Sequence, residues 1–218
     1  MSSVQKAHRI GAVILAAGAS RRMGQNKSLL SIDGRPMLAR VWQTLRTASE
    51  RIVVVTGHDA GRVRSAIANA APDVQFVHNP EYEAGEMLSS IKVGVEAIRG
   101  VDAFFVALGD QPRVREATLR QLVDSWQSTR ARVVRPTYRG KHGHPVLLDA
   151  SCIELILALP PAATLNEFVR ADTTQTVDVA VRDQATIEDI DTPADYAAAK
   201  TRRGGRTNQW ENRHVHAK

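Results

Sequence analysis

Residues 12–15 form a short apolar run whose last residue opens the segment LAAGASRRMGQNK. The run has the length and composition of a buried β-strand. Gly18 and Gly24 then allow the backbone to turn tightly and to approach a ligand without a Cβ in the way. Successive N–H groups in such a turn can form a concave anion site, and Arg22 and Lys27 add fixed positive charge. We therefore predict a loop that binds the phosphates of a nucleotide at the end of a strand.

This loop differs from two common phosphate-binding motifs. Gly18 and Gly24 are six residues apart and Lys27 follows three residues later, so the spacing of a Walker loop is absent. The pattern G-x-G-x-x-G of dinucleotide-binding folds is absent as well. The alternative is a glycine-rich turn with two solvated basic residues, but a position directly after a strand favours a phosphate site.

Strand-like and helix-like segments alternate along the chain, which is typical of a parallel sheet covered by helices. The further strands are predicted at residues 51–56, 74–77 and 101–108, and the helices around residues 38–45, 63–70, 87–98 and 119–126. Neither an internal repeat nor a linker divides the sequence. We therefore predict one three-layer, doubly wound, mostly parallel α/β domain of Rossmann-like type over residues 1–200. Ligands of such a domain lie at the carboxyl ends of its strands.

The net charge of +6 is concentrated at the C-terminal end. Residues 201–218 contain five basic residues and one acidic residue, so they carry +4 and leave +2 for the rest of the chain. This balance argues against nucleic-acid binding, which requires a dense basic face with aromatic residues. The same segment has little apolar content and no periodicity, and we predict that it is a flexible basic tail.

A single cysteine, Cys152, excludes an internal disulfide and favours a reducing compartment. We expect Cys152 to pack as a small apolar residue beside Ile153. No apolar run approaches the length of a membrane span, and the first residues lack the apolar core of a signal peptide. We therefore expect a cytoplasmic enzyme without a membrane contact.

Two carboxylates are candidates to hold a divalent cation. Asp110, in the segment GDQP, follows the predicted strand 101–108 and therefore faces the crevice that the first loop lines. Mg²⁺ requires oxygen ligands, together with water and substrate phosphates. The alternative for Asp110 is a turn residue before a proline. Asp191 precedes a predicted helix start at Thr192-Pro193. Thr192 and Pro193 are residue types preferred at a helix start, whereas Asp191 lies before the cap and has no such structural reason.

Residues 136–146 form a basic, glycine-punctuated loop between two apolar runs. Lys141 and His144 are candidates to bind the phosphate of an acceptor substrate, and a simple hairpin with exposed polar residues is an equal alternative. His142 and His144 are two residues apart, which indicates zinc only weakly because no third ligand is in sight.

These segments together resemble a known family. The patterns LAAGxSxRMGxxK, GDQP, GHPV and DxDTPxD are similar to motifs of the nucleotidyltransferases related to molybdenum cofactor enzymes, over about residues 11–200. The resemblance implies a nucleotidyltransferase fold of the type predicted above and Mg²⁺ as cofactor, with Asp110 and Asp191 as its ligands. Ser89 belongs to a serine pair that lies beside the nucleotide in the family, although the local sequence departs from the usual one. Ala17 is the residue expected in cytidylyl-transferring members, where guanylyl-transferring members have glycine.

The resemblance further implies a reaction. CMP is transferred from CTP to the terminal phosphate of molybdopterin carrying molybdenum, and pyrophosphate is released. Arg22, Lys27 and Asp110 are the implied catalytic residues, and Lys141 and His144 the candidates for acceptor binding. The implied nucleotide-binding residues are Leu15, Ala16, Ala17, Gly18, Ser20, Lys27, Ser89 and Asp110. A molybdenum hydroxylase that receives the product is an implied transient partner.

Three alternatives stay open at this point. They are a guanylyltransferase acting on the same pterin, a cytidylyltransferase acting on another phosphorylated acceptor, and a non-enzymatic chaperone that binds the pterin. A related reductase would need a nicotinamide-binding motif, and G-x-G-x-x-G with a downstream acid is absent from the sequence.

Overall fold

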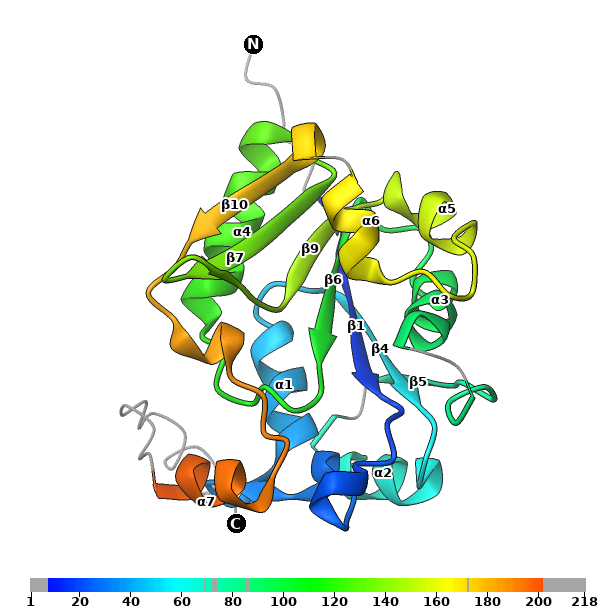
Figure 1. The fold of residues 1–218 in the computed structure, drawn as a ribbon, viewed down its shortest axis with the longest axis vertical. Helices are drawn as coiled ribbons and strands as arrows, with labels where there is room; N and C mark the ends of the chain where they lie inside the picture. The colour runs from blue at the N-terminus through cyan, green and yellow to red at the C-terminus, as the bar shows by residue number, and fades with distance from the viewer. Residues whose placement is uncertain (1–7, 69, 72–73, 85–86, 172, 202–218) are drawn as a thin grey trace, which may run out of the picture.

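A computed structural model of the protein describes residues 8–68, 70–71, 74–84, 87–171 and 173–201, and its centre is a mixed sheet (Figure 1). The strands of this sheet are β1 (Ile10–Ala16), β4 (Arg51–Thr56), β5 (Gln75–His78), β6 (Ala103–Leu108), β7 (Val133–Tyr138), β8 (Lys141–His142), β9 (Val146–Asp149) and β10 (Thr176–Ala180). The helices are α1 (Met37–Leu45), α2 (Ala60–Ile67), α3 (Met87–Ala97), α4 (Glu116–Thr129), α5 (Cys152–Leu157), α6 (Leu165–Ala171) and α7 (Pro193–Thr201). The predicted alternation of strands and helices is therefore confirmed.

The strand order is β10-β7-β9-β6-β1-β4-β5, with β8 paired to β7. β1 lies parallel between β4 and β6, β5 continues in parallel from β4, and β10 is parallel to β7. β9 runs antiparallel to both β6 and β7, which the sequence interpretation did not specify. The sheet is thus mostly parallel, and the carboxyl ends of β1 and β6 lie next to each other.

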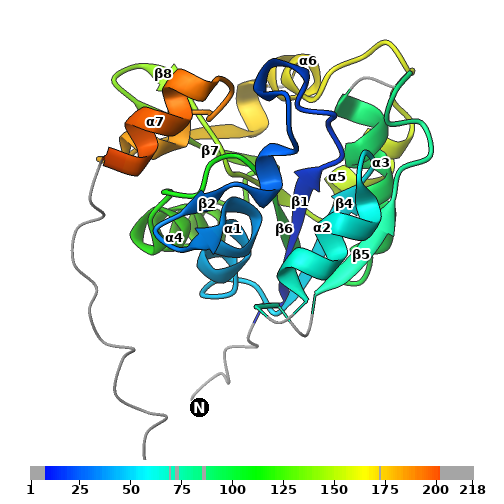
Figure 2. The ribbon, with the colours of Figure 1, turned by 90° about the horizontal axis from the view of Figure 1, so that it is seen from below.

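Each face of the sheet has its own hydrophobic core, so the molecule has three layers. Side chains of α1, α2 and α4 pack with Ala12 and Ile14 of β1 on one face. Side chains of α3, α5 and α6 pack with Val13 of the same strand on the other face. Figure 2 shows α1 and α4 on one side of β1 and α3 on the other. This alternation along β1 is the period of a strand buried on both sides. The predicted three-layer α/β architecture is confirmed.

A third, smaller core attaches the C-terminal helix to the phosphate loop. Its buried members are Met23, Leu30, Ile32, Met37, Ile190 and Ala199, and they come from the segment after β1, the hairpin β2 (Ser31–Ile32) and β3 (Arg35–Pro36), the start of α1, and α7 with the segment before it. The hydroxyl of Tyr196 on α7 donates to the carbonyl of Ser31 over 2.8 Å. This core brings the end of the domain beside its beginning, which positions the site described below.

The structure also bears on the expectations for Cys152, for membrane spans and for the tail. Cys152, the first residue of α5, is fully buried as part of the hydrophobic core, as expected, and burial raises the pKa of its thiol to about 12. Among the residues that the structure describes, no helix is long and apolar enough to cross a membrane. The predicted tail lies outside the described residues, apart from Thr201 at the end of α7.

Candidate active site

The glycine-containing loop after β1 is closed by its own polar side chains. Ser20 and Gly24 have φ angles of 51° and 67°, so the backbone enters the left-handed region on both sides of a short turn. The Ser20 Oγ accepts a hydrogen bond of 3.1 Å from the backbone N–H of Lys27. Asn26 caps the next turn because its Oδ1 accepts from the N–H of Ser28 over 3.1 Å. The loop therefore presents Lys27 from a fixed backbone position.

Lys27 links two carboxylates that are far apart in the sequence. Its ammonium group donates to Asp110 Oδ2 and, over 2.8 Å, to Asp191 Oδ1. Arg22 Nη2 donates to the other oxygen of Asp191, also over 2.8 Å. The structure therefore brings together Arg22, Lys27, Asp110 and Asp191, which the sequence interpretation had taken from three separate motifs.

The strand ends explain why these carboxylates meet. Asp110 follows β6, and the N–H of Gly109 donates to the carbonyl of Leu15 over 3.0 Å, which fixes the end of β6 against the end of β1. The N–H of Ile190 donates to the carbonyl of Asp110 over 3.3 Å, so the segment before α7 is attached to the same strand end. This contact positions Asp191 beside the phosphate loop.

The predicted start of α7 is a capping box. Thr192 N–H donates to Asp195 Oδ2 over 2.8 Å, and Asp195 N–H donates back to Thr192 Oγ1 over 3.2 Å. Asp195 Oδ2 also accepts from the N–H of Asp191, at 3.3 Å. The cap therefore holds the backbone of Asp191 as well as the helix.

The charges of the site influence each other's protonation. Burial raises the pKa of Asp110, and the ammonium group of Lys27 opposes that shift. The hydrogen bond from Lys27 lowers the pKa of the less buried Asp191. Burial alone would lower the pKa of Lys27, but its contacts with both carboxylates outweigh burial and raise it. The site therefore keeps a charged lysine at neutral pH.

A cavity of about 360 Å³ lies over these groups. The sequence-predicted residues that line it are Leu15, Ala16, Ala17, Gly18, Ser20, Arg22, Lys27, Asp110 and Asp191. Ser90 lines it too, whereas Ser89 is not among the lining residues, and both hydroxyls accept from Asn79 Nδ2 at 2.9 Å. Tyr82 and Asp189 also line it, although sequence reasoning had assigned neither of them a role.

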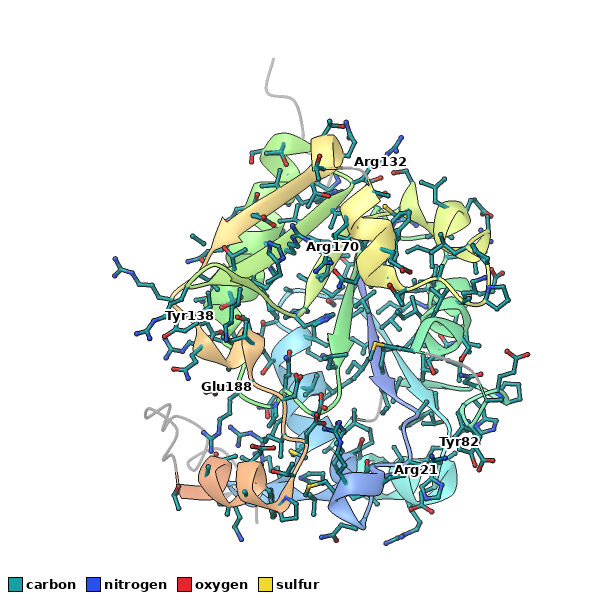
Figure 3. The ribbon with its side chains drawn as sticks, in the orientation of Figure 1. Arg21, Tyr82, Arg132, Tyr138, Arg170 and Glu188 are labelled. Carbon is teal, nitrogen blue, oxygen red and sulfur yellow. The ribbon has the colours of Figure 1, made fainter. Side chains whose placement is uncertain are left out.

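Tyr82 also borders a neighbouring hollow that Ala19, Arg21, His58 and Glu83 line. Figure 3 labels Arg21 and Tyr82 close together at this end of the molecule. The ring of Tyr82 packs against Gly57, where an added Cβ would lie 2.5 Å from the Tyr82 Cβ and 2.6 Å from the carbonyl oxygen of Ala17. A side chain at position 57 would therefore displace this wall.

A second cavity, of about 600 Å³, lies between α3, the β7–β9 region and α6. Lys141 and His144 both line it, and so do Arg135 from β7 and Arg170 from α6. Arg170 is labelled in Figure 3. Met87, at the start of α3, lines both cavities, so the two adjoin. Lys141 pairs with Tyr138, so this segment does form a β7–β8 hairpin, and Lys141 also lines the cavity.

His144 is held as an uncharged ring. Burial lowers the pKa of His144, and Nδ1 is shielded from solvent without a hydrogen-bond partner among the described residues. Its backbone N–H donates to the carbonyl of Thr186 over 2.8 Å, and the His144-Pro145 peptide bond is cis. A neutral imidazole can donate or accept a hydrogen bond but adds no positive charge.

The donor set matches magnesium better than zinc. No group of three or more His, Cys, Asp or Glu side chains suited to a metal occurs in the described part of the chain. Zinc sites normally use three or four such protein ligands. Mg²⁺ is instead bound by one or two carboxylates together with substrate phosphates and water. Asp110 and Asp191 fit that pattern because both already face one cation, the ammonium group of Lys27.

A glycine-containing loop after β1 that faces a carboxylate after β6, on a mostly parallel sheet, is the arrangement that the sequence motifs predicted for a nucleotidyltransferase. The profile of the MobA-like NTP transferase domain matches residues 12–178, and the chain belongs to this family. This match agrees with the resemblance that the sequence motifs indicated.

Two curated relatives extend the comparison. The chain is 28% identical over 193 residues to the molybdenum cofactor cytidylyltransferase of Escherichia coli (strain K12), which covers 88% of this chain and 96% of that protein. It is 37% identical over 151 residues to the bifunctional protein GlmU of Burkholderia thailandensis, covering 66% of this chain and 32% of that protein. The chain thus spans nearly all of the first relative and about a third of the second.

A solved structure has the same fold. Rv0371c of Mycobacterium tuberculosis H37Rv matches with a TM-score of 0.77 at 25% identity, over 89% of this chain and 99% of that one. A second structure of Rv0371c, in complex with manganese, matches with a TM-score of 0.71 at 25% identity, over 88% of this chain and 97% of that one.

Proposed function

We propose that this nucleotidyltransferase transfers CMP from CTP to the terminal phosphate of molybdopterin carrying molybdenum, in a Mg²⁺-dependent reaction. The observation that carries the proposal is the convergence of Arg22, Lys27, Asp110 and Asp191 in the cavity beside the loop. The likeness to the Escherichia coli cytidylyltransferase supports the choice of nucleotide and acceptor.

The reaction needs no protein nucleophile. An acceptor phosphate oxygen attacks the α-phosphorus of CTP, the bond from that phosphorus to the bridging oxygen breaks, and pyrophosphate leaves with the electron pair. Catalysis then depends on positioning and on stabilisation of charge. Backbone N–H groups around Gly18 and Ser20 would bind the phosphates, and Arg22 and Lys27 would neutralise charge on the α-phosphate and the leaving group.

Asp110 and Asp191 would hold the divalent cation. When bound, Mg²⁺ neutralises phosphate charge and fixes the geometry of the triphosphate. Asp110 contributes a buried carboxylate from the rigid end of β6, and Asp191 a more exposed one from the capped start of α7.

The second cavity would receive the acceptor. It adjoins the nucleotide cavity at Met87, so an acceptor phosphate can reach the α-phosphorus while the rest of the molecule occupies the larger space. Lys141 would bind an anionic group, while the neutral ring of His144 would form a hydrogen bond. In this division both residues keep the acceptor-binding role expected from the sequence, and only Lys141 supplies positive charge.

The first experiment mixes the purified protein with Mg²⁺, the molybdopterin acceptor and one of CTP, GTP, UTP or ATP, and measures pyrophosphate release. We expect release with CTP only when acceptor and metal are both present. Faster release with GTP would favour the guanylyltransferase alternative. Acceptor binding without release from any nucleotide would favour the chaperone. The proposal also includes a transient contact with a molybdenum hydroxylase that receives the product, and a cytoplasmic location.

A further inference from the structure

The carboxylate pair of the site is already occupied by cations of the chain itself. Lys27 donates hydrogen bonds to Asp110 Oδ2 and Asp191 Oδ1, and Arg22 donates one to Asp191 Oδ2. Three of the four carboxylate oxygens are therefore engaged by two side chains of the phosphate loop. Asp110 is 7% exposed, so an unpaired charge there would be costly and the lysine neutralises it.

A divalent cation needs these same oxygens. An ammonium group and a Mg²⁺ ion within contact distance of one carboxylate pair would repel each other, and the repulsion is strong where burial reduces screening by solvent. We propose that Lys27 occupies the place of the divalent cation in the nucleotide-free protein, and that the metal enters when a nucleotide triphosphate draws the lysine away. This inference rests on the metal site of the proposed function and concerns the order in which that site is filled.

The loop is built so that the side chain of Lys27 can move while its backbone stays. Ser20 Oγ holds the backbone N–H of Lys27, and Leu30 N–H donates to the carbonyl of Lys27 over 3.1 Å. The ammonium group is carried on a flexible four-carbon chain. Lys27 also lines the same cavity as Gly18 and Ser20, so phosphates bound along the loop offer it new negative partners within that cavity.

Coupled binding of metal and nucleotide follows from this exchange. A metal ion that binds alone must first displace Lys27 from both carboxylates. A metal ion that binds together with a triphosphate does not, because the ammonium group of Lys27 then contacts the phosphates. By linkage, each ligand then strengthens the binding of the other by the same factor. A nucleotide-free protein with weak affinity for divalent ions is the direct consequence.

The test measures Mn²⁺ binding to nucleotide-free protein from the electron paramagnetic resonance signal of the free ion, at pH 8. We expect weak binding to the wild type and about 10-fold or tighter binding to Lys27→Met, a factor within the usual range of coupling between sites. Arg21→Met is the matched control, because it removes one charge from the same loop at a residue that does not line the nucleotide cavity. This control should bind Mn²⁺ as the wild type does.

Three further variants separate the inference from the metal site itself. Arg22→Met removes the second partner of Asp191 at a side chain that is 71% exposed, so it should fold normally and strengthen Mn²⁺ binding by a smaller factor than Lys27→Met. Lys27→Met combined with Asp110→Asn should lose the tighter binding. Equal affinity in wild type and Lys27→Met, with loss in Asp110→Asn, overturns the lysine exchange and leaves the metal site standing. Equal gains in Lys27→Met and Arg21→Met would also overturn it, since overall charge would then explain the effect. Absence of Mn²⁺ binding from every variant overturns the metal site and the exchange together.

Discussion

Asp110 takes part in both a side-chain and a backbone contact of the site. It is buried at the end of β6, pairs with Lys27 through its side chain, and accepts from Ile190 through its carbonyl. Asp110→Asn keeps the size of the side chain and its backbone contacts but removes the charge. We expect kcat to fall by about 100-fold or more, as for the loss of other preorganised electrostatic groups.

The measurement is steady-state pyrophosphate release, with far-ultraviolet circular dichroism to verify the fold. Asp102→Asn is a useful control, because Asp102 lies just before the start of β6 and accepts from the backbone N–H of Arg9, far from the loop. Near-normal turnover in Asp110→Asn, with unchanged dependence on Mg²⁺, would remove Asp110 from the proposed metal site.

Ala17 tests the choice of base at the residue scale. Its side chain is 7% exposed in the nucleotide cavity, and its carbonyl accepts from the N–H of His58 over 3.1 Å. Ala17→Gly removes one methyl group from the wall and makes the backbone more flexible. We expect the preference for CTP over GTP to relax but not to reverse, since one methyl group contributes about 1–3 kcal/mol of discrimination.

The deciding quantity for Ala17 is kcat/KM for CTP and for GTP with the same acceptor, in wild type and variant. Ala19→Gly serves as a control because Ala19 lines the neighbouring hollow and not the nucleotide cavity. A wild type that prefers GTP would replace the cytidylyl proposal with the guanylyl alternative.

At the scale of elements, α7 is the part of the fold that completes the site. Asp195→Ala removes the acceptor for the N–H groups of Thr192 and Asp191. We expect a loss of about 1 kcal/mol in the free energy of unfolding, the usual effect of losing a helix cap. Turnover should fall as well, because Asp191 loses the contact that holds its backbone.

Urea unfolding and transferase assays on the same preparation check both effects. Glu116→Ala is the matched control: Glu116 also lies in the first turn of a helix, and its side chain is 3.7 Å from Arg120 on an exposed surface. If turnover in Asp195→Ala equals that of the control, the cap supports the helix without positioning Asp191.

The elements differ in how far the sequence could predict them. Strong periodic patterns predicted β1, β4 and β6 and the helices α1, α3 and α4, because each buries one face or both. The direction of β9 was not predicted, since an apolar run at residues 146–149 reads the same in either direction. The short connection between Tyr138 at the end of β7 and Val146 at the start of β9 did indicate that the two strands are antiparallel. A few residues can join antiparallel strands but not parallel ones. α5 and α6 are too short for a helical period to stand out.

The site shows the same limit. Asp110 was recognisable because it comes shortly after an apolar strand. Lys27 was recognisable because it ends the glycine-containing loop that follows another apolar strand. Arg170 was missed because it comes from α6, which the sequence pattern did not predict. Asp189 was not assigned a role, although it lies two residues before Asp191 and this spacing of two carboxylates was visible in the sequence. In the structure the Oδ1 of Asp189 accepts a hydrogen bond from Gln111 Nε2 over 2.8 Å. Partners that meet through packing of distant elements leave no local pattern.

For the whole molecule, the buried thiol of Cys152 links stability to pH. Burial raises its pKa to about 12 from an ordinary value of 9.0, so the folded chain keeps a proton that the unfolded chain releases near pH 9. The unfolded state then binds fewer protons, and this contribution to stability falls as pH rises above 9. By pH 10 the loss should reach about 1.4 kcal/mol relative to pH 8.

The comparison of wild type with Cys152→Ala isolates the loss of stability that is due to the thiol. Lysine and tyrosine residues titrate in both proteins, so their effect on the free energy of unfolding cancels in the difference. Free energies of unfolding in urea at pH 8, 9 and 10 give the difference at each pH. A difference that stays constant over this range would mean that the thiol ionises equally in both states.

The predicted tail is tested on the whole chain by truncation. A protein ending at Thr201 keeps all of α7 and its contacts through Tyr196 and Ala199. We expect it to retain transferase activity, because residues 202–218 are too polar to bury apolar surface. Loss of turnover with an unchanged melting temperature would show instead that the basic segment helps to bind the acceptor.

The distance along the chain between the groups of the site also bears on how the protein is made. Lys27 and Asp110 are 83 residues apart, and Lys27 and Asp191 are 164 residues apart. A chain that leaves the ribosome from its N-terminus exposes the loop after β1 early, and Asp191 emerges much later with the helix that holds it. Chains that stop before Asp191 lack one carboxylate of the pair, so nucleotide with metal should stabilise only chains that extend past this residue. Ligand-dependent protection from proteolysis in a series of stalled chains should begin abruptly once Thr201 has emerged.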